Sequence, residues 1–477
     1  MSEAPGDSLL YKQVAGKIQQ LIQSGTLRPG DRIPSVRRAS EQHGVSVTTT
    51  LQAYLELENR GFIEARPKSG FFVRPQIQSR MPEPRASKPA SAVRAVSVGN
   101  LQSRLFEAVR MPGIVPFGGA APGVALLPEA KLNRILASVA RSAGERGVSY
   151  DPPPGAESLR REIARRALNA GSHISRDEIV TTSGGTEALM LCLRAVTKRG
   201  DVVAVESPAY FGVLHAMEEL GLKALELPMH PRDGMDLNAL ESLLKIHSIA
   251  ACVAVPTFSN PLGALMPDEN KRRLVELLTR REVPLIEDDI FGELYFGAQR
   301  PRAAQSYDKT GLVMLCSSFS KTLAPGYRVG WIVPGRYQAR IQTLKLTSTL
   351  ATATLPELAI AEFLANGGYD HYLRSARRTY AELVDCMRGA ITSAFPPGIK
   401  ITRPAGGFVL WIELPKKVDA LALDDLALAQ NISIAPGPMF SATQGFRNFI
   451  RISCGHPWSP RIESALGTLG TLVKKLS

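Results

Sequence analysis

From residue 113 onward the sequence alternates apolar runs with glycine-containing turns and helix-like segments, and this alternation constrains the fold more than any other feature. The repeating units are IVTTSGGTEALMLCLRAV, DVVAVESPAYFG, IAACVAVPTFSNPLG, PLIEDDIFGEL and LVMLCSSFSK. Near-continuous apolar strands between helices are typical of a mostly parallel sheet covered on both faces. The pattern therefore predicts an α/β domain over residues 113–477. In such sheets ligands bind at the carboxyl ends of the strands.

The segment CSSFSKTLAPGYRVGW, residues 316–331, follows one of these strands and brings two cations together. The amine of Lys321, desolvated beside a second cation, would lose proton affinity and could form a Schiff base with an aldehyde. Arg328 offers the planar donor fork that suits a phosphate dianion, and Ser318 and Ser320 add hydroxyl donors. An aldehyde that carries a phosphate is pyridoxal 5'-phosphate, so the segment predicts a site for this cofactor. The alternative is a surface loop with incidental basic residues.

Further polar residues stand at the ends of other predicted strands. Gly185 and Thr186 open a helix, where free amides and the helix dipole favour a phosphate. Tyr210 could stack on a planar ring or simply pack, and Asn260 could bind a ligand or only form its Pro-Gly turn. Asp288 ends the run LIED, where a buried carboxylate requires a partner such as a protonated pyridine nitrogen.

The order and spacing of these residues resemble the fold type I aminotransferases over residues 113–477, with a large sheet domain and a smaller C-terminal subdomain. The resemblance implies that Lys321 is the catalytic lysine that binds the cofactor aldehyde, while Asp288 pairs with the pyridine nitrogen. It further implies that Asn260 bonds the ring hydroxyl and that Tyr210 stacks on the ring. The phosphate would be held by Gly185, Thr186, Ser318, Ser320 and Arg328.

Two more residues gain a role only from this resemblance. Tyr150 in SYDPPPG matches a tyrosine that reaches the phosphate from the neighbouring subunit, which implies a homodimer. Arg451 in FIRISCG matches the arginine that binds the α-carboxylate of an amino acid; taken alone, it would indicate a structural salt bridge. The sequence departs from the family at Phe291, where a tyrosine is usual, and at Ala120, where a glycine is usual. Loss of the phenol is expected to spare cofactor binding and to affect turnover.

The first 75 residues predict a separate small α+β domain. A first helix is marked by apolar residues at helical spacing, namely Leu10, Val14, Ile18, Leu21 and Ile22. Ser35 is expected to cap a second helix and Ser46 a third. The predicted inner stripe of the third helix is Leu51, Tyr54 and Leu55. Residues 62–66 and 71–74 alternate as two strands, so the whole predicts a winged helix-turn-helix.

A winged helix-turn-helix points to double-stranded operator DNA. Thr48 and Thr49 would enter the major groove from the third helix, and Arg37, Arg38 and Lys68 would meet flanking phosphates. Ser35, Ser46 and Gly70 complete the predicted contact set. The pattern alone also allows a protein-interaction module. The strings PGDRIPS, AYLELENRGFI and RPKSGFFV resemble the DNA-binding domain of the GntR family, which favours DNA, although Val47 stands where that family usually carries an arginine.

Composition separates the two domains and indicates a compartment. Residues 76–112 are rich in Pro, Ser, Ala and Arg and predict a basic linker, with a short helix at Leu101, Leu105 and Val109. Residues 1–112 hold +7 of the net charge of +13, which favours a polyanionic partner. The sequence has no membrane-spanning run and no export signal, and its five cysteines lack zinc or disulfide spacing. We therefore expect a cytoplasmic protein without a metal site.

The order of head, linker and aminotransferase-like domain resembles the MocR subfamily of transcriptional regulators. The resemblance implies a regulator that senses pyridoxal 5'-phosphate, an amino acid or amine bound to it as an external aldimine, or both. It also implies a homodimer that exchanges its DNA-binding heads head-to-tail. Two alternatives remain open, namely an active aminotransferase with an accessory head and a cytosolic enzyme with a module that does not bind DNA.

Overall fold

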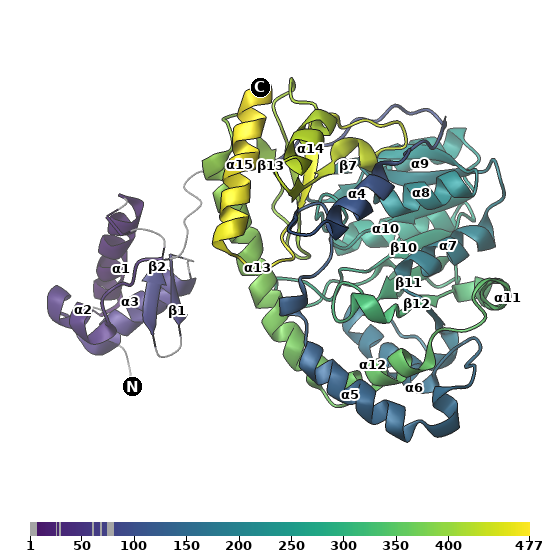
Figure 1. Ribbon diagram of the computed structural model, residues 1–477, viewed down its shortest axis with the longest axis horizontal. Helices are drawn as coiled ribbons and strands as arrows, with labels where there is room; N and C mark the ends of the chain where they lie inside the picture. Colours follow the sequence, from purple (N-terminus) through teal and green to yellow (C-terminus); the bar gives the residue numbers. More distant parts are fainter. Residues whose placement is uncertain (1–6, 25, 28–29, 60–61, 67–68, 74–80) are drawn as a thin grey trace. The chain divides into compact units, whose positions relative to one another are not determined.

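The computed structural model of the protein describes residues 7–24, 26–27, 30–59, 62–66, 69–73 and 81–477 (Figure 1). The chain divides into two compact units, one of Met1–Arg80 with the short segment Arg388–Ser393 and one of Met81–Met387 with Ala394–Ser477. Residues 1–80 are called the head, and residues 81–477 are called the large unit.

The head contains three helices and a hairpin, as the sequence predicted. The helices are α1 (Asp7–Gln23), α2 (Val36–His43) and α3 (Val47–Asn59), and the antiparallel strands are β1 (Ile63–Arg66) and β2 (Gly70–Val73). The Ser35 hydroxyl caps α2 by accepting a hydrogen bond from the amide of Arg38, and the Ser46 hydroxyl caps α3 by accepting one from the amide of Thr49 at 3.0 Å. Lys68 lies outside the described residues.

The rotation of α3 about its axis differs from the prediction. Tyr54 is fully buried, its hydroxyl donates to the carbonyl oxygen of Pro34 at 2.8 Å, and its ring packs edge-on against Phe71. Ala53 and Leu57 are buried with it, whereas Leu51 and Leu55 are 42% and 47% exposed. The predicted inner stripe was right at Tyr54 and wrong at Leu51 and Leu55, because Thr50, Ala53 and Leu57 follow the helical repeat with Tyr54 equally well and are buried with it.

Thr49 also differs from its predicted place on the outer face of α3. Its side chain is buried, and its hydroxyl lies 2.7 Å from the hydroxyl of Ser46. Thr49 therefore stabilises the start of the helix, and Thr48 beside it is exposed. The apolar residues predicted for α1 also divide into two groups. Val14, Ile18 and Ile22 are buried, whereas Leu10 and Leu21 are exposed.

The large unit is built on a mixed sheet of nine strands, which confirms the predicted α/β fold (Figure 1). Its strand order is β3-β7-β6-β9-β10-β11-β12-β5, with β8 paired to β7, and the segment from β7 to β11 is parallel. The strands are β3 (Arg94–Ala95), β5 (Val180–Thr182), β6 (Val202–Ser207), β7 (Lys223–His230), β8 (Gly234–Met235), β9 (Ala251–Ala254), β10 (Leu285–Asp288), β11 (Val313–Ser318) and β12 (Gly330–Val333).

Helices cover both faces of this sheet, and successive strand residues enter opposite cores. Leu285 and Val313 pack in the core beneath α9 (Leu237–Ile246) and α10 (Asp268–Thr279). Ile286 and Met314 pack in the core beneath α7 (Gly185–Val196), α8 (Phe211–Glu219) and α11 (Gln338–Ser348). The remaining helices of this part are α4 (Leu101–Arg110), which confirms the short helix predicted there, α5 (Glu129–Ser142), α6 (Glu157–Ala167) and α12 (Thr354–Ala365).

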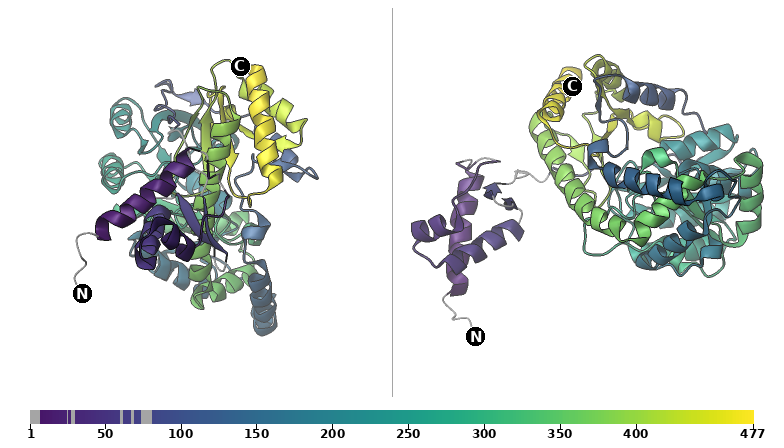
Figure 2. Two further views of the ribbon diagram at one scale, coloured as in Figure 1. Left: turned by 90° about the vertical axis from the view of Figure 1, so that its left-hand side faces the viewer. Right: turned by 60° about the horizontal axis from the view of Figure 1, so that its bottom comes forward.

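A C-terminal subdomain follows the long helix α13 (Gly368–Ala394), which runs along one side of the large unit (Figure 2). Its antiparallel sheet has the order β13-β14-β17-β16. The elements are β13 (Lys400–Ile401), β14 (Val409–Glu413), α14 (Ala420–Leu428), β16 (Ala435–Pro436), β17 (Phe449–Ser453) and α15 (Pro460–Leu476), and β15 (Ile432–Ser433) pairs with β4 (Val115–Pro116). Within the described ranges, no helix combines the length and apolar character needed to cross a membrane.

Residues 81–98, here called the strap, were expected to belong to the linker of residues 76–112. In the structure they lie on the large unit. The carbonyl of Pro82 accepts from Ile401 of the C-terminal subdomain, Ser87 exchanges backbone and side-chain hydrogen bonds with Met229 of β7, and β3 extends the large sheet. Part of the predicted linker is therefore bound to the large unit. The sequence did not reveal this, because hydrogen bonds from a serine and from a short strand give no periodic pattern in a proline-rich segment.

Replacing Ser87 by alanine should loosen the strap. The Ser87 hydroxyl donates to the carbonyl of Ser207 and accepts from the amide of Met229 at 2.8 Å. Leaving both groups unpaired costs about 1–3 kcal/mol. Amide hydrogen exchange measured by mass spectrometry should then accelerate roughly tenfold within the strap. Ser91→Ala, a change at an exposed strap serine, is the control; equal protection in the two variants would contradict the assigned role of Ser87.

Candidate functional site

A cavity of about 280 Å³ lies at the carboxyl ends of β10 and β11. It brings together residues that are far apart in the sequence and that stand in loops or at element ends. Eight predicted site residues line it, namely Gly185, Thr186, Tyr210, Asn260, Asp288, Ser320, Lys321 and Arg328. Ser318 is buried next to the cavity, and its hydroxyl accepts from the amide of Ser320 at 3.2 Å.

Lys321 lines this cavity and stands three residues after the end of β11. Its Nζ donates to the carbonyl oxygen of Ala120 at 2.6 Å. Burial, together with the positive charge of Arg451, lowers the pKa of Lys321 to about 8. Roughly a tenth of the amine is therefore neutral and nucleophilic at pH 7, far more than for an ordinary lysine.

Asp288 supplies a buried carboxylate at the last position of β10. One oxygen accepts from the amide of Ile290 at 3.2 Å. Burial and the neighbouring charge of Asp289 raise the pKa of Asp288 to about 7. A carboxylate in this position gains most from a cationic partner that enters the cavity.

The other end of the cavity carries the groups suited to an anion. Arg328 donates to the hydroxyl of Ser320 and to the carbonyl of Ser183, each at 3.3 Å. Gly184 has φ of 90°, and a Cβ there would lie 2.5 Å from the Arg328 guanidinium, so the close approach requires glycine. The first amides of α7, at Gly185 and Thr186, face this end of the cavity with the positive pole of the helix dipole.

Arg451 lies on β17 with no solvent exposure. One guanidinium nitrogen donates to the carbonyl of Gly118, while Nε and Nη1 are buried without a hydrogen-bond partner. Burial lowers the pKa of Arg451 to about 10, and the nearby phenol of Tyr210 opposes that shift. Nε and Nη1 lie on different sides of the guanidinium, and a carboxylate oxygen would satisfy either of these donors.

Tyr150 does not reach the cavity of its own chain, since it is 79% exposed and is not among the lining residues. Four apolar lining residues were not predicted from the sequence, namely Phe106, Leu189, Val255 and Ile290. Phe106 of α4 is 52% exposed although it is aromatic, and it lies off the buried stripe of Leu105 and Ala108. An aromatic residue outside the buried face of its helix was the sequence signal that could have identified Phe106 as a site residue.

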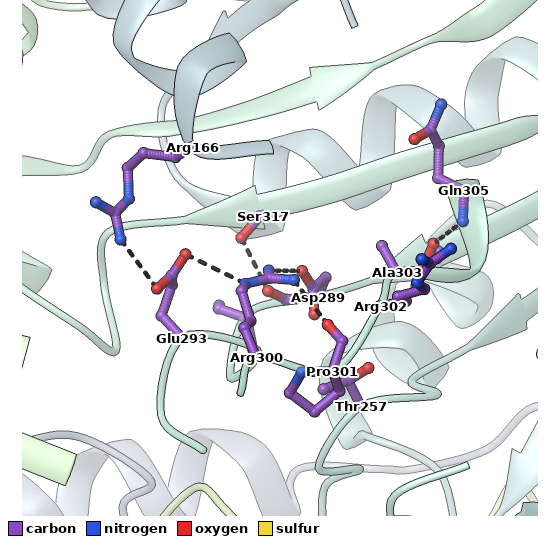
Figure 3. Close-up of polar contacts among 12 residues, drawn as sticks. Arg166, Thr257, Asp289, Glu293, Arg300, Pro301, Arg302, Ala303, Gln305 and Ser317 are labelled. Atoms are coloured by element: carbon purple, nitrogen blue, oxygen red, sulfur yellow. Dashed lines mark hydrogen bonds and ion pairs between the residues drawn. The ribbon is translucent and has the colours of Figure 1, made fainter. Parts of the chain in front are cut away.

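A network of charged residues surrounds Asp289, which follows Asp288 in the chain (Figure 3). Arg300 bonds Asp289 and also bonds Glu293, at 3.2 Å, and Glu293 in turn accepts from Arg166 at 3.0 Å. The hydroxyl of Ser317 donates to the carbonyl of Asp289 at 2.9 Å, which ties the end of β10 to β11. Arg300 is 9% exposed, so it neutralises Asp289 in a buried setting next to Asp288.

The head presents a second polar surface. Arg37 and Arg38 of α2 are exposed, as are Thr48 and Gln52 of α3. Gly70 begins β2 with φ of 100°, and a Cβ there would lie 3.3 Å from Nε of Arg32. Of the residues predicted for DNA contact, Thr49 is buried and the others within the described ranges lie on the outside of the head or at its helix caps.

Two protein families match this chain in succession. "Bacterial regulatory proteins, gntR family" matches residues 10–73, and "Aminotransferase class I and II" matches residues 123–466. The HTH-type transcriptional regulator YdcR of Escherichia coli is 41% identical over 98% of this chain and 99% of its own length. The chain belongs to this family of HTH-type regulators with a GntR head and an aminotransferase class I and II domain.

Other relatives share one or both parts of this architecture. YjiR of Escherichia coli, another HTH-type transcriptional regulator, is 37% identical over 97% of this chain and 98% of its own length. The 2-aminoadipate transaminase of Thermus thermophilus is 32% identical over 78% of this chain and 93% of its own. The solved structure of LysN, the α-aminoadipate aminotransferase of Thermus thermophilus, has a TM-score of 0.73 at 30% identity, covering 79% of this chain and 97% of its own.

The cofactor of this regulator's large unit is pyridoxal 5'-phosphate. The residues of the cavity fit this group. The side-chain oxygen of Asn260 is buried without a partner, Asp288 lacks a cationic hydrogen-bond partner among the described residues, and a dianion finds Arg328 and free helix amides. Each polar part of the cofactor thus meets a group of complementary chemistry.

Covalent attachment of the cofactor should depend on Lys321 and on pH. After incubation with pyridoxal 5'-phosphate and reduction by borohydride, mass spectrometry should find the pyridoxyl group on Lys321 and none at the cavity in Lys321→Ala. Because the neutral amine reacts and its pKa is lowered to about 8, the attachment rate should level off above pH 8 and not rise toward 10.5. Modification of another cavity residue would contradict the assignment.

Removing Arg300, which does not line the cavity, should raise the pKa of Asp288. In Arg300→Gln the charge of Asp289 loses its counterion and should raise the pKa of Asp288 by about one unit, which would weaken cofactor binding up to about tenfold at pH 7 and spare it at higher pH. Fluorescence titration across pH 6–9 measures this affinity. The double variant Asp289→Asn/Arg300→Gln removes both charges and should restore it; equal weakening at every pH in both variants would indicate a purely structural effect.

Proposed function

We propose that this chain is a transcriptional regulator of the MocR type, in which binding of pyridoxal 5'-phosphate and an amino compound to the large unit alters binding of the head to operator DNA. The observation that carries the proposal is the presence of two unpaired buried donors on Arg451, which is not itself a lining residue but acts electrostatically on Lys321 in the cavity, in a chain that also carries a winged helix-turn-helix. A guanidinium in this state favours a ligand with a carboxylate.

Each polar residue of the cavity takes one part of this ligand pair in the proposal. When bound, the cofactor supplies an aldehyde and an electron-withdrawing ring. Lys321 binds the aldehyde and Asp288 holds a proton at the pyridine nitrogen, while Asn260 bonds the ring hydroxyl and Tyr210 packs on the ring face. Arg328 binds the phosphate with Gly185, Thr186, Ser318 and Ser320, and Arg451 binds the carboxylate of an amino acid effector.

The proposal includes a homodimer. Tyr150 lies on the surface outside its own cavity, as expected of a side chain that completes the phosphate site of a second copy. Two further exposed apolar residues, Val148 and Leu350, support burial of this region against another surface. A head-to-tail exchange of the heads belongs to the same proposal.

The strap offers a physical route from ligand to head. At one end, Met81 and Pro82 bond Arg403 and Ile401 of the C-terminal subdomain, which also carries Arg451. Further on, Ser87 bonds the carbonyl of Ser207, three residues before Tyr210. A movement of the C-terminal subdomain toward a carboxylate on Arg451 would therefore act on the segment that leads into the head.

Phe291 favours regulation over rapid turnover. It stands at the cavity where a tyrosine would bond the cofactor, but its ring is buried edge-on against Phe408 at 5.2 Å and brings no donor. The alternative, an active aminotransferase with an accessory head, predicts steady-state transamination at rates usual for enzymes, of about 1–10³ s⁻¹.

Titration of DNA binding by ligand tests the proposal. Duplexes enriched from a random library by the full-length protein should change affinity about five- to 150-fold, the usual range of allosteric coupling, when the cofactor and an amino acid from a panel are both present. Arg451→Ala should keep the response to the cofactor alone and lose the response to amino acids. A full response to the cofactor alone that is unchanged in Arg451→Ala would remove the amino compound from the proposal, and rapid transamination without DNA binding would favour the enzyme.

A further inference from the structure

Three exposed apolar side chains form a stripe along the outer face of α3. Val47, Leu51 and Leu55 are 51%, 42% and 47% exposed, and they follow one another at intervals of four residues. This spacing places them on one side of the helix over slightly more than two turns. They are called the apolar stripe.

The polar residues on the same face are neutral. Thr48 and Gln52 are exposed next to the stripe, and the segment from Val47 to Leu55 contains no charged residue. The positive charge lies on α2 instead, where Arg37 and Arg38 are exposed. The helix that a winged helix-turn-helix inserts into the major groove therefore offers methyl groups, hydroxyls and one amide, while the cations stand to the side.

Base pairs differ in what they show to such a surface. The C5-methyl of thymine is the apolar group in the major groove, and the amide of glutamine is matched to adenine. Guanine is read chiefly by arginine or lysine, which this face of α3 lacks. We infer that the apolar stripe contacts thymine methyl groups, so that α3 selects A·T base pairs by apolar contact and by Gln52. This inference rests on the proposed DNA binding and specifies what the head reads.

Two observations favour DNA over a protein as the occupant of the stripe. Three side chains interleaved with Thr48 and Gln52 form a patch far smaller than the roughly 800 Å² per partner of a stable protein interface. Arg37 and Arg38, exposed on the preceding helix α2, suit the phosphates that border a groove, and residues 1–75 carry 10 Lys and Arg against 7 Asp and Glu. The occupant consistent with the exposed arginines of α2 and with this net positive charge is a duplex.

Replacing thymine by uracil tests the inference directly, because uracil differs from thymine only by the absent methyl group. The probe is the set of duplexes that full-length protein enriches from a random library, resynthesised with one thymine at a time changed to uracil. Contacted positions should lose about fourfold in affinity per methyl removed, as expected for one buried methyl. The enriched duplexes should contain A·T pairs at those positions.

Variants connect the effect to the stripe. Val47→Ala and Leu51→Ala should bind the thymine and uracil forms equally at the position that each residue contacts. Leu21→Ala on α1 is the matched control, because Leu21 is 42% exposed like Leu51, and it should keep the full thymine preference. Gln52→Ala should lose discrimination at a neighbouring adenine.

Each other outcome overturns the inference in a distinguishable way. If duplexes are enriched but uracil is neutral at every position, the stripe does not read methyl groups while DNA binding stands. If uracil is neutral and Leu51→Ala lowers the oligomeric state in sedimentation, the stripe is a protein interface. If no duplex is enriched, both the inference and the proposed DNA binding fail.

Discussion

Three consecutive carboxylates, those of Glu287, Asp288 and Asp289, are buried where β10 ends, and the surrounding structure compensates them unequally. Glu287 accepts from two backbone amides, at Ala304 and Gln305, and Asp289 is paired with Arg300. Asp288 receives one amide hydrogen bond, from Ile290. Burying a charge is costly unless it is paired, so Asp288 is the least compensated of these three carboxylates, and it lines the cavity.

Arg451 is a buried positive charge whose hydrogen bonding is also incomplete. Its guanidinium is fully buried and keeps two donors unpaired, and its charge helps to lower the pKa of Lys321, which Asp288 tends to raise. Burial and two opposite charges, neither of them paired with a counterion among the described residues, thus set the pKa of Lys321. A ligand with a cationic ring nitrogen and a carboxylate would pair with both Asp288 and Arg451. The kind of ligand can therefore be inferred from a few side chains.

The candidate site of the large unit could be predicted because binding the cofactor requires particular residue types at the ends of strands. Asp288 ends an apolar run and Lys321 closely follows one, and a parallel sheet brings such positions to one edge whatever their distance in sequence. Arg328 stands just before the antiparallel strand β12 and was predicted from its spacing to Lys321. The rotation of α3 was not predictable in the same way, because its sequence contains two apolar stripes and only the burial of Tyr54 selects between them. The pair of Arg300 and Asp289 was missed because it joins a loop to a strand end without a periodic signal.

The fixed strap limits how far the head can travel. Because Met81 is already bonded to the large unit, only the chain between Val73 and Met81 is left to span the two units. Eight Cα steps of about 3.5 Å reach at most roughly 28 Å, which is less than one turn of B-DNA at about 34 Å. In a dimer, each head could lie no further than this from the point where its strap leaves the large unit, so two heads would reach half-sites only up to a limited separation. Spacing between half-sites, and not only their sequence, would then decide which operators both heads can occupy at once.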